Sequence, residues 1–310
     1  MASGLGVDSL VNMLTATSAQ LTEENFAAVR AMPGFRRACE TASAESVGLF
    51  ANLEPAYQWI TKDLGRAGIC MTAAILHYAG ELTVQSLTAA CVGNGVSSPG
   101  RVNQVARRCQ EIGQLTVEDG PGIWTRRRAH IGSGLLEMLH QRGLCDMKAA
   151  MSLRPELSGG LEIMRTEAGA VSALMHLARV SGERRDLFAF GKKRPINFFL
   201  DREAGMSILF DLLASQRSDR TRLLEEAPLS RYALARRYGV SRAHINKLLS
   251  ESGHAQAIGD RVVFSETLSE ALEAHYALVF AHNHGAARTL LKGWRYRQPG
   301  NRPDASASAA

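Results

Sequence analysis

The segment from Leu229 to Gly253 constrains the fold of this chain more than any other. It predicts one helix, a tight turn at 239–241, and a second helix whose apolar residues Ile245 and Leu248 recur at helical spacing. Two short helices joined by such a turn form a helix-turn-helix, in which the second helix lies in the major groove of DNA. We therefore expect a mainly α-helical protein built around a unit that reads DNA.

The second helix of this motif carries polar side chains that suit DNA. Ser241 is placed to cap the helix, whose N-terminal N–H groups attract phosphate. Asn246 can pair with adenine and Arg242 with guanine, while a lysine reaches guanine or phosphate. The alternative is a solvated helix face in a domain that binds other proteins. The residues expected to contact DNA in this half of the chain are Ser241, Arg242, His244, Asn246, Lys247 and Arg261.

A β-hairpin is expected directly after this motif. Two short runs, 255–258 and 261–264, flank Gly259-Asp260, and a Gly-Asp pair between such runs is typical of a hairpin turn. A helix-turn-helix followed by a hairpin is a winged helix, in which the hairpin forms the wing. The sequence therefore predicts a winged-helix unit at 201–265.

A weaker version of the motif occurs upstream, at 82–113. Ser98 is placed as the cap of its second helix, and Pro99 occupies the favoured first helical position. Arginine and amide side chains then share the open face of that helix, where a solvated arginine face is the alternative. The residues expected to contact DNA from this helix are Ser98, Arg101, Asn103, Gln104, Arg107 and Arg108.

A wing is expected after the upstream motif as well. Strands at 114–117 and 123–128 would flank the turn at 118–122, whose Glu-Asp-Gly-Pro-Gly sequence has strong turn chemistry. The return strand would then carry three consecutive arginines, and alternation along a strand would point at least one of them toward phosphates or the minor groove. These candidate DNA contacts are Arg126, Arg127 and Arg128.

The two halves resemble each other beyond the motifs themselves. Leu87 and Leu234 occupy matching positions, and Val102 and Val105 of the first half align with Ile245 and Leu248 of the second. Such recurrence indicates an internal duplication, with convergent patterning of two similar motifs as the alternative. The predicted fold class is therefore mainly α, with two winged helix-turn-helix units, small β-wings and flanking helices.

The length of 310 residues suits about two domains of ordinary size. Flanking helices are expected on periodicity and capping chemistry at 21–32, 35–52, 69–78, 133–142, 161–180, 206–213 and 265–292. The expected organisation is an N-terminal helical region at 1–60, a first winged helix at 61–148, a helical connector at 149–200, a second winged helix at 201–265, C-terminal helices at 266–296 and a disordered tail at 297–310.

Positive charge is concentrated in the two candidate units. The formal net charge is +6, yet 95–130 alone holds six arginines against three carboxylates. The stretch 229–262 holds six basic residues against two carboxylates. A basic footprint of this kind is what binding to a phosphate backbone requires.

The five cysteines are scattered and none forms a Cys-x-x-Cys pair, so they do not indicate a disulfide framework. We expect them to be buried as small apolar residues, with a redox-sensing role for Cys109 as the alternative. No apolar run approaches the roughly 18 residues that span a bilayer, and the N-terminus lacks signal-peptide features. We expect a cytoplasmic, nucleoid-associated protein with no membrane partner.

Enzymatic chemistry finds little support in the sequence. His275 and His282 could share a helix face, and His282-Asn-His284 superficially resembles a metal motif, but no Asp/Glu cluster accompanies them. The glycines at 93–95 lack the Lys-Ser/Thr of a phosphate-binding loop. We expect no catalytic residues, no metal and no cofactor.

The run SPGRV at 98–102, followed by Val105, Arg108, Gly113 and an arginine-bearing hairpin, resembles the winged-helix regulators of the multiple-antibiotic-resistance (MarR) family. The resemblance covers about 70–140. It returns more faintly over about 206–285. Such regulators are typically homodimers with a helical dimerisation region formed by the chain ends, and they often release palindromic DNA when a small phenolic or oxidant signal binds.

This chain departs from the family pattern in two respects. It contains two units, and the turn at 118–122 stands where the family has Asp-x-Arg at the wing tip, so a ligand response does not carry over. The resemblance implies a covalent pseudo-dimer that reads two unlike half-sites on double-stranded DNA. Further dimerisation of the chain and a small-molecule effector stay open as additional partners.

We therefore expect a sequence-specific transcriptional regulator that uses two tandem winged helices. Three alternatives remain. A plasmid-type replication initiator also pairs two winged helices in one chain, a non-specific architectural protein would show no site preference, and a protein-interaction scaffold would not bind DNA at physiological salt.

Overall fold

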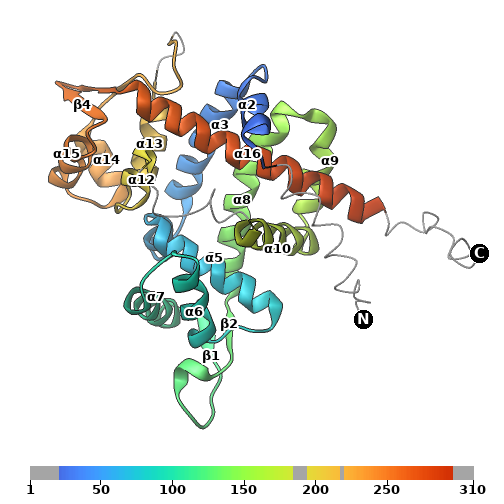
Figure 1. The fold of residues 1–310 in the computed structure, drawn as a ribbon. Helices are drawn as coiled ribbons and strands as arrows, with labels where there is room; N and C mark the ends of the chain where they lie inside the picture. The colour runs from blue at the N-terminus through green and yellow to red at the C-terminus, as the bar shows by residue number, and fades with distance from the viewer. Residues whose placement is uncertain (1–20, 184–193, 217–219, 296–310) are drawn as a thin grey trace, which may run out of the picture.

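The computed structural model describes residues 21–183, 194–216 and 220–295, so the tail expected at 297–310 lies outside it. The described chain is mainly helical with two small antiparallel sheets, as the apolar periodicity predicted (Figure 1). The helices are α2 Glu23–Arg30, α3 Phe35–Asn52, α4 Pro55–Thr61, α5 Leu64–Ala79, α6 Val84–Gly93, α7 Pro99–Glu111, α8 Ser133–Leu153, α9 Ser158–Met164, α10 Glu167–Glu183, α12 Pro195–Leu200, α13 Gly205–Ala214, α14 Arg231–Tyr238, α15 Arg242–Glu251 and α16 Glu266–Arg295. The strands are β1 Leu115–Val117, β2 Ala129–Ile131, β3 Glu226–Pro228, β4 Ala255–Ile258 and β5 Arg261–Phe264, and two short 3₁₀ helices lie at η1 Trp124–Arg126 and η2 Pro155–Leu157.

One order of elements occurs twice along the chain. In the second half, α13 is followed by β3, α14, α15, the hairpin β4–β5 and α16, and the strands form a sheet in the order β3-β5-β4. In the first half, α5 is followed by α6, α7, the hairpin β1–β2 and α8. There, Thr83 forms a single β-bridge with Arg128, beside β2. One bridge therefore takes the place that β3 holds in the second half.

Local chemistry explains where the paired helices begin and turn. Thr83 Oγ1 accepts a hydrogen bond from Ser86 N at 2.9 Å and Ser86 Oγ accepts one from Thr83 N at 3.0 Å, a reciprocal cap that starts α6. Ser230 caps α14 as expected, because its side chain accepts a hydrogen bond from Ala233 N. Gly95 and Gly239 lie in the turns with φ of 67° and 57°, a backbone region that glycine adopts at low cost.

The first hairpin differs from the expectation. Its return strand is β2, paired through Leu115↔Ile131 and Val117↔Ala129, and not the predicted strand at 123–128. The reason is burial: Ala129 and Ile131 are buried against the core, whereas Ile123 is 62% exposed. The arginines at 126–128 therefore lie in the long connection between the strands and not on the return strand.

The prediction of one continuous helix at 161–180 was also wrong. The chain forms two helices there, α9 and α10, separated at Arg165 and Thr166. Thr166 Oγ1 accepts a hydrogen bond from Gly169 N at 3.1 Å and so caps the start of α10. By contrast, α3 and the hairpin β4–β5 have the predicted boundaries.

Two hydrophobic clusters organise the described residues. One packs α5, α6, α7 and the hairpin β1–β2 around Leu87, Val102 and Leu135, the last on α8. The other packs the N-terminal helices α2 and α3 with α12–α16 around Phe199 and Tyr276. Between them, α5, α8, α10 and α16 enclose a mainly apolar cavity of about 220 Å³. No helix within the described ranges has the length and apolar character needed to cross a lipid bilayer.

Candidate nucleic-acid interface

Helix α15 presents most of its predicted contact residues to solvent. Ser241 Oγ accepts a hydrogen bond from His244 N at 3.0 Å, so the expected cap is present. Arg242 and Asn246 are exposed, and the side chain of Lys247 is 71% exposed with its Nζ 3.7 Å from a carboxylate oxygen of Glu251. The buried face of the helix consists of Ile245, Leu248 and Leu249, as the periodicity predicted.

Arg231 is a site residue that the sequence did not single out. Its Nε donates to Asn246 Oδ1 at 2.6 Å, and its Nη1 donates to the Gly259 carbonyl at 3.0 Å. One guanidinium therefore joins α14, α15 and the turn of the β4–β5 hairpin. The sequence shows this arginine only as one more positive charge, because the two acceptors lie 15 and 28 positions away.

Arg261 lies on β5 beside the same hairpin turn. Its side chain is 65% exposed and its Nη1 is 2.9 Å from a carboxylate oxygen of Glu226 on β3. The ion pair raises the pKa of the Arg261 guanidinium, because Glu226 accepts its hydrogen bond and stabilises the charged form. The arginine is therefore a positive group at the start of the central strand, and it is already paired within the protein.

Two predicted contact residues are bound to a loop of their own half instead of standing free. The His244 ring Nε2 is 2.8 Å from the carbonyl oxygen of Glu203, and Arg101 forms an ion pair with Asp63, the N-cap of α5. The same two loops are tied by a hydrogen bond from Ala204 N to the Lys62 carbonyl. The N-terminal ends of α7 and α15 are thus linked through two short loops.

Helix α7 carries the remaining residues of the first unit. Ser98 occupies the N-cap position, but its side chain makes no capping hydrogen bond, contrary to expectation. Gln104 and Arg107 are exposed, and Arg108 is exposed with its guanidinium 2.9 Å from Glu111. Asn103 is half-buried; within the described part of the chain its Oδ1 is buried and accepts no hydrogen bond, so this residue does not lie fully on the open face.

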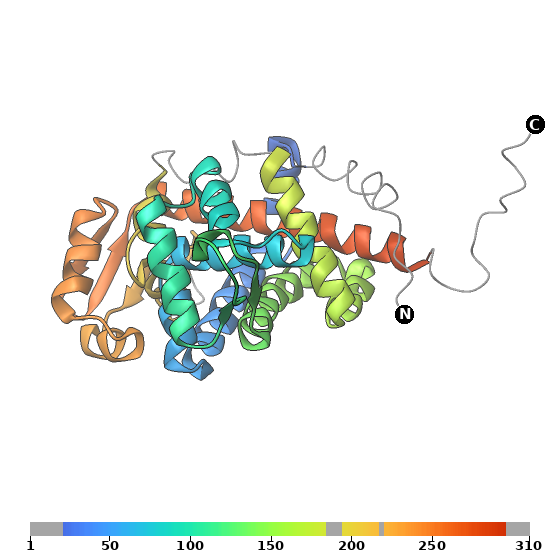
Figure 2. The ribbon, with the colours of Figure 1, turned by 90° about the horizontal axis from the view of Figure 1, so that it is seen from below.

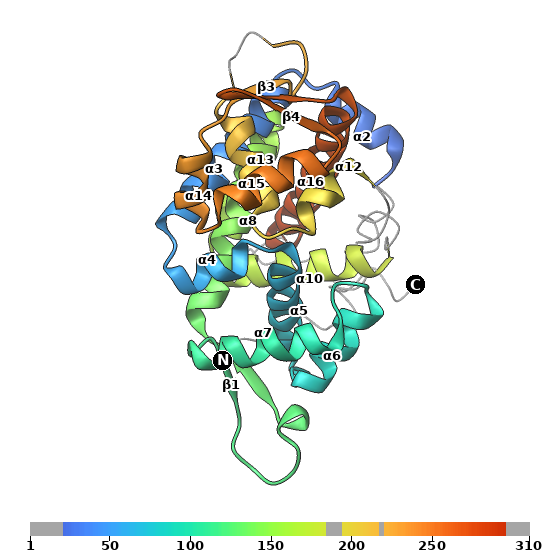
Figure 3. The same cartoon turned by 90° about the vertical axis from the view of Figure 1, so that its left-hand side faces the viewer.

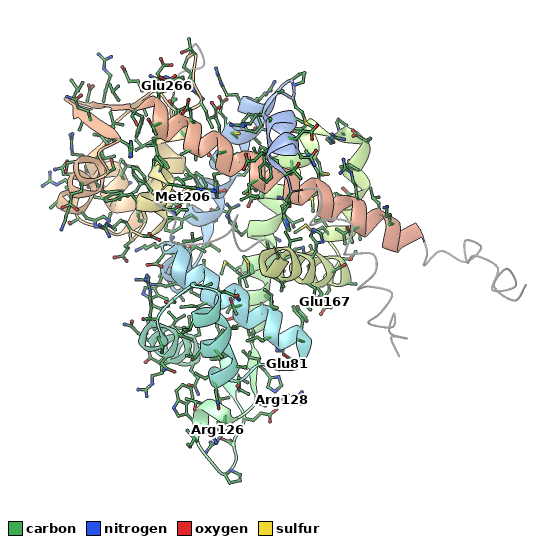
Figure 4. All side chains as sticks on the ribbon, in the orientation of Figure 1. Glu81, Arg126, Arg128, Glu167, Met206 and Glu266 are labelled. Carbon is green, nitrogen blue, oxygen red and sulfur yellow. The ribbon has the colours of Figure 1, made fainter. Side chains whose placement is uncertain are left out.

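The three consecutive arginines have different surroundings in the long connection of the first hairpin. Arg126 is exposed, whereas Arg127 is half-buried and donates to the Gly122 carbonyl at 2.9 Å. Arg128 donates to the Gly80 carbonyl at 3.1 Å, at the C-terminal end of α5. Figure 4 shows Arg126 farther out along the hairpin than Arg128. Arg126 is therefore the arginine of this run that is best placed for an external contact.

Helix α7 and the connection of the first hairpin also touch. The Arg107 guanidinium lies over the ring of Trp124 at 5.7 Å from its centroid, which is within the range of a cation–π contact. Trp124 begins the 3₁₀ helix that contains Arg126. This contact holds the arginine-bearing connection beside α7.

Both second helices lie on one side of the molecule. Figure 3, which turns the left side of Figure 1 toward the viewer, shows α7 and α15 together on the facing surface. Figure 2 shows the same two helices toward one end when the molecule is seen from below. A single extended partner could therefore contact both.

Comparisons with known proteins give no relative: no protein family, curated protein or solved structure was found to match the chain.

Proposed function

We propose that this protein is a sequence-specific transcriptional regulator that binds double-stranded DNA through two winged helices in one chain. The observation that carries the proposal is the repeated order of helix, strand or bridge, two helices and hairpin, with α7 and α15 on the same side. In a winged helix of this order the third helix is the one that enters the major groove. The proposal includes a pseudo-dimer similar to the MarR family.

The charges on this side favour a polyanionic partner. Arg107, Arg126, Arg242 and Lys247 are exposed, and exposed cations displace the counterions that condense on duplex DNA. Asn246 and Gln104 add exposed amides, which can read base edges. Arginine–phosphate contacts would supply most of the affinity and the amides most of the specificity.

The test is selection of genomic DNA fragments by the purified full chain at physiological salt, followed by sequencing. Recovery of a few sites with two unlike half-sites about one helical turn apart is the expected result. Iterated direct repeats would favour a replication initiator. Fragments bound without any enriched sequence would favour an architectural role, and no bound DNA at all would reject the proposal.

A further inference from the structure

Two buried thiols meet between the first and the third helix of the first unit. Cys70 on α5 and Cys109 on α7 have their sulfur atoms 3.9 Å apart, and both side chains are buried. The described structure holds four buried cysteines, Cys39, Cys70, Cys91 and Cys109, and records a sulfur–sulfur contact for this pair. The two residues are 39 positions apart in the sequence, so their pairing follows from helix packing alone.

The backbone around Cys109 connects α7 to the hairpin. Its carbonyl oxygen accepts a hydrogen bond from Gln114 N at 2.7 Å, one residue before β1. Gln114 in turn receives hydrogen bonds from Gly132 N on its carbonyl and from Leu135 N on its side chain, at the start of α8. A displacement of Cys109 relative to α5 would therefore reach the recognition helix, the hairpin and α8 together.

We propose that Cys70 and Cys109 form a reversible disulfide under oxidation by a hydroperoxide, and that this bond shifts the C-terminal end of α7. In the first step the Cys109 thiolate attacks one oxygen of hydrogen peroxide, the O–O bond breaks, and the products are a sulfenic acid and hydroxide, which takes up the thiol proton as water. In the second step Cys70 sulfur attacks the sulfenic sulfur, the S–O bond breaks, and the released hydroxide takes the Cys70 proton as a second water. Two thiols lose two electrons and the peroxide gains them.

The surroundings assign the two roles. The hydrogen bond from the Cys70 thiol lowers the pKa of the Cys109 thiol, because it stabilises the Cys109 thiolate. The same hydrogen bond and burial raise the pKa of Cys70 well above its usual value. Cys109 is thus the attacking sulfur and Cys70 the resolving one. Bond formation brings the two sulfurs about 2 Å closer, to the usual length of about 2.05 Å, and this closure strains the packing of α7 on α5.

The first test is peptide mapping of the full chain after treatment with hydrogen peroxide and blocking of free thiols. Trypsin leaves Cys70 and Cys91 in one peptide, 67–101, and Cys109 in another, 109–126. The expected product is a cross-link between these peptides that dithiothreitol reverses. It should persist in Cys91→Ala and disappear in Cys70→Ala. A cross-link that disappears in Cys91→Ala, or its absence from the oxidised wild-type chain, would overturn the proposal.

The second test measures the displacement without relying on DNA. The rate of amide hydrogen exchange within 109–126 should increase when the Cys91→Ala variant is oxidised. It should stay unchanged when the Cys70→Ala variant is oxidised. An unchanged exchange rate in a cross-linked sample would refute the shift of α7. For DNA binding, which rests on the proposed function, oxidation should weaken affinity at least about tenfold in a reversible way. If the reduced chain binds no DNA while the cross-link and exchange change are present, the regulatory function fails and the disulfide site stands.

Discussion

Asn246 is held in place by a residue on another helix. Its Oδ1 accepts a hydrogen bond from Arg231 Nε, and its amide NH₂ group is the donor part of the side chain. The second lone pair of Oδ1 can still accept a hydrogen bond from a base. The side chain is therefore oriented before any partner arrives, which reduces the entropy lost on binding.

At this scale we expect Asn246→Ala to reduce the free energy of binding to the selected site by about 1–3 kcal/mol, while binding to unrelated DNA stays the same. The reason is that the variant loses a contact to a base and keeps every contact to phosphate. Titration of labelled duplexes of both kinds measures this. Ser250→Ala is the matched control, because Ser250 is also exposed on α15. Equal losses on both duplexes would remove Asn246 from the base-reading set.

Arg231→Ala should reproduce much of the specificity loss of Asn246→Ala, because it releases the amide that it orients. The double variant should lose less than the sum of the two single variants, as is common for residues in one hydrogen-bonded network. A double-mutant cycle of affinities for the selected site measures the coupling. Full additivity would show that Arg231 acts independently of Asn246.

At the scale of elements, the two hairpins show what sequence alone can establish. The strands β4 and β5 were predicted with correct boundaries because their turn is two residues long and its signal is local. The strand β2 was misplaced because its position depends on pairing far along the chain, where Ala129 N donates to the Leu82 carbonyl. Turn chemistry at 118–122 indicates a reversal of the chain but not the residue at which pairing resumes.

The same limit applies to the candidate interface. The apolar face of α15 and its cap at Ser241 follow from spacing within a few residues, and both were correct. The partners of Arg101 and His244 lie 38 and 41 positions away, so no local pattern could reveal them. The buried faces of α7 and α15 were thus predictable from periodicity, whereas the availability of their polar groups depends on tertiary contacts.

The connection of the first hairpin leads to a prediction about salt. Arg126→Gln should reduce the slope of log affinity against log salt by about 0.9 on all DNA sequences, because each phosphate contact releases about that many counterions. Affinities measured between about 50 and 200 mM salt give the slope. Arg165→Gln is a suitable control, because Arg165 lies at the end of α9, outside both hairpins, and is exposed and paired with Glu162. A slope that stays at the wild-type value would place this hairpin away from DNA.

At the scale of the whole molecule, the separate hydrophobic clusters predict local stability. Leu87 is buried in the first cluster and Leu248 in the second. Each change to alanine should cost about 2–5 kcal/mol in the free energy of unfolding of its own cluster. Native-state hydrogen exchange should then rise within the first cluster, at 64–131, for Leu87→Ala and within the second cluster, in α2, α3 and α12–α16, for Leu248→Ala. Exchange that rises equally across both ranges would show that the chain opens as a single cooperative unit.

The recurrence of one element order in a single polypeptide has a consequence for inheritance. In a homodimer each codon change appears in both subunits, so the two binding surfaces must change together and remain alike. Here α7 and α15 are encoded separately and already differ in sequence and in their contacts. If both helices bind DNA as proposed, selection can alter one surface while the other keeps its contacts, and a new target can be acquired in steps that each preserve half of the previous one.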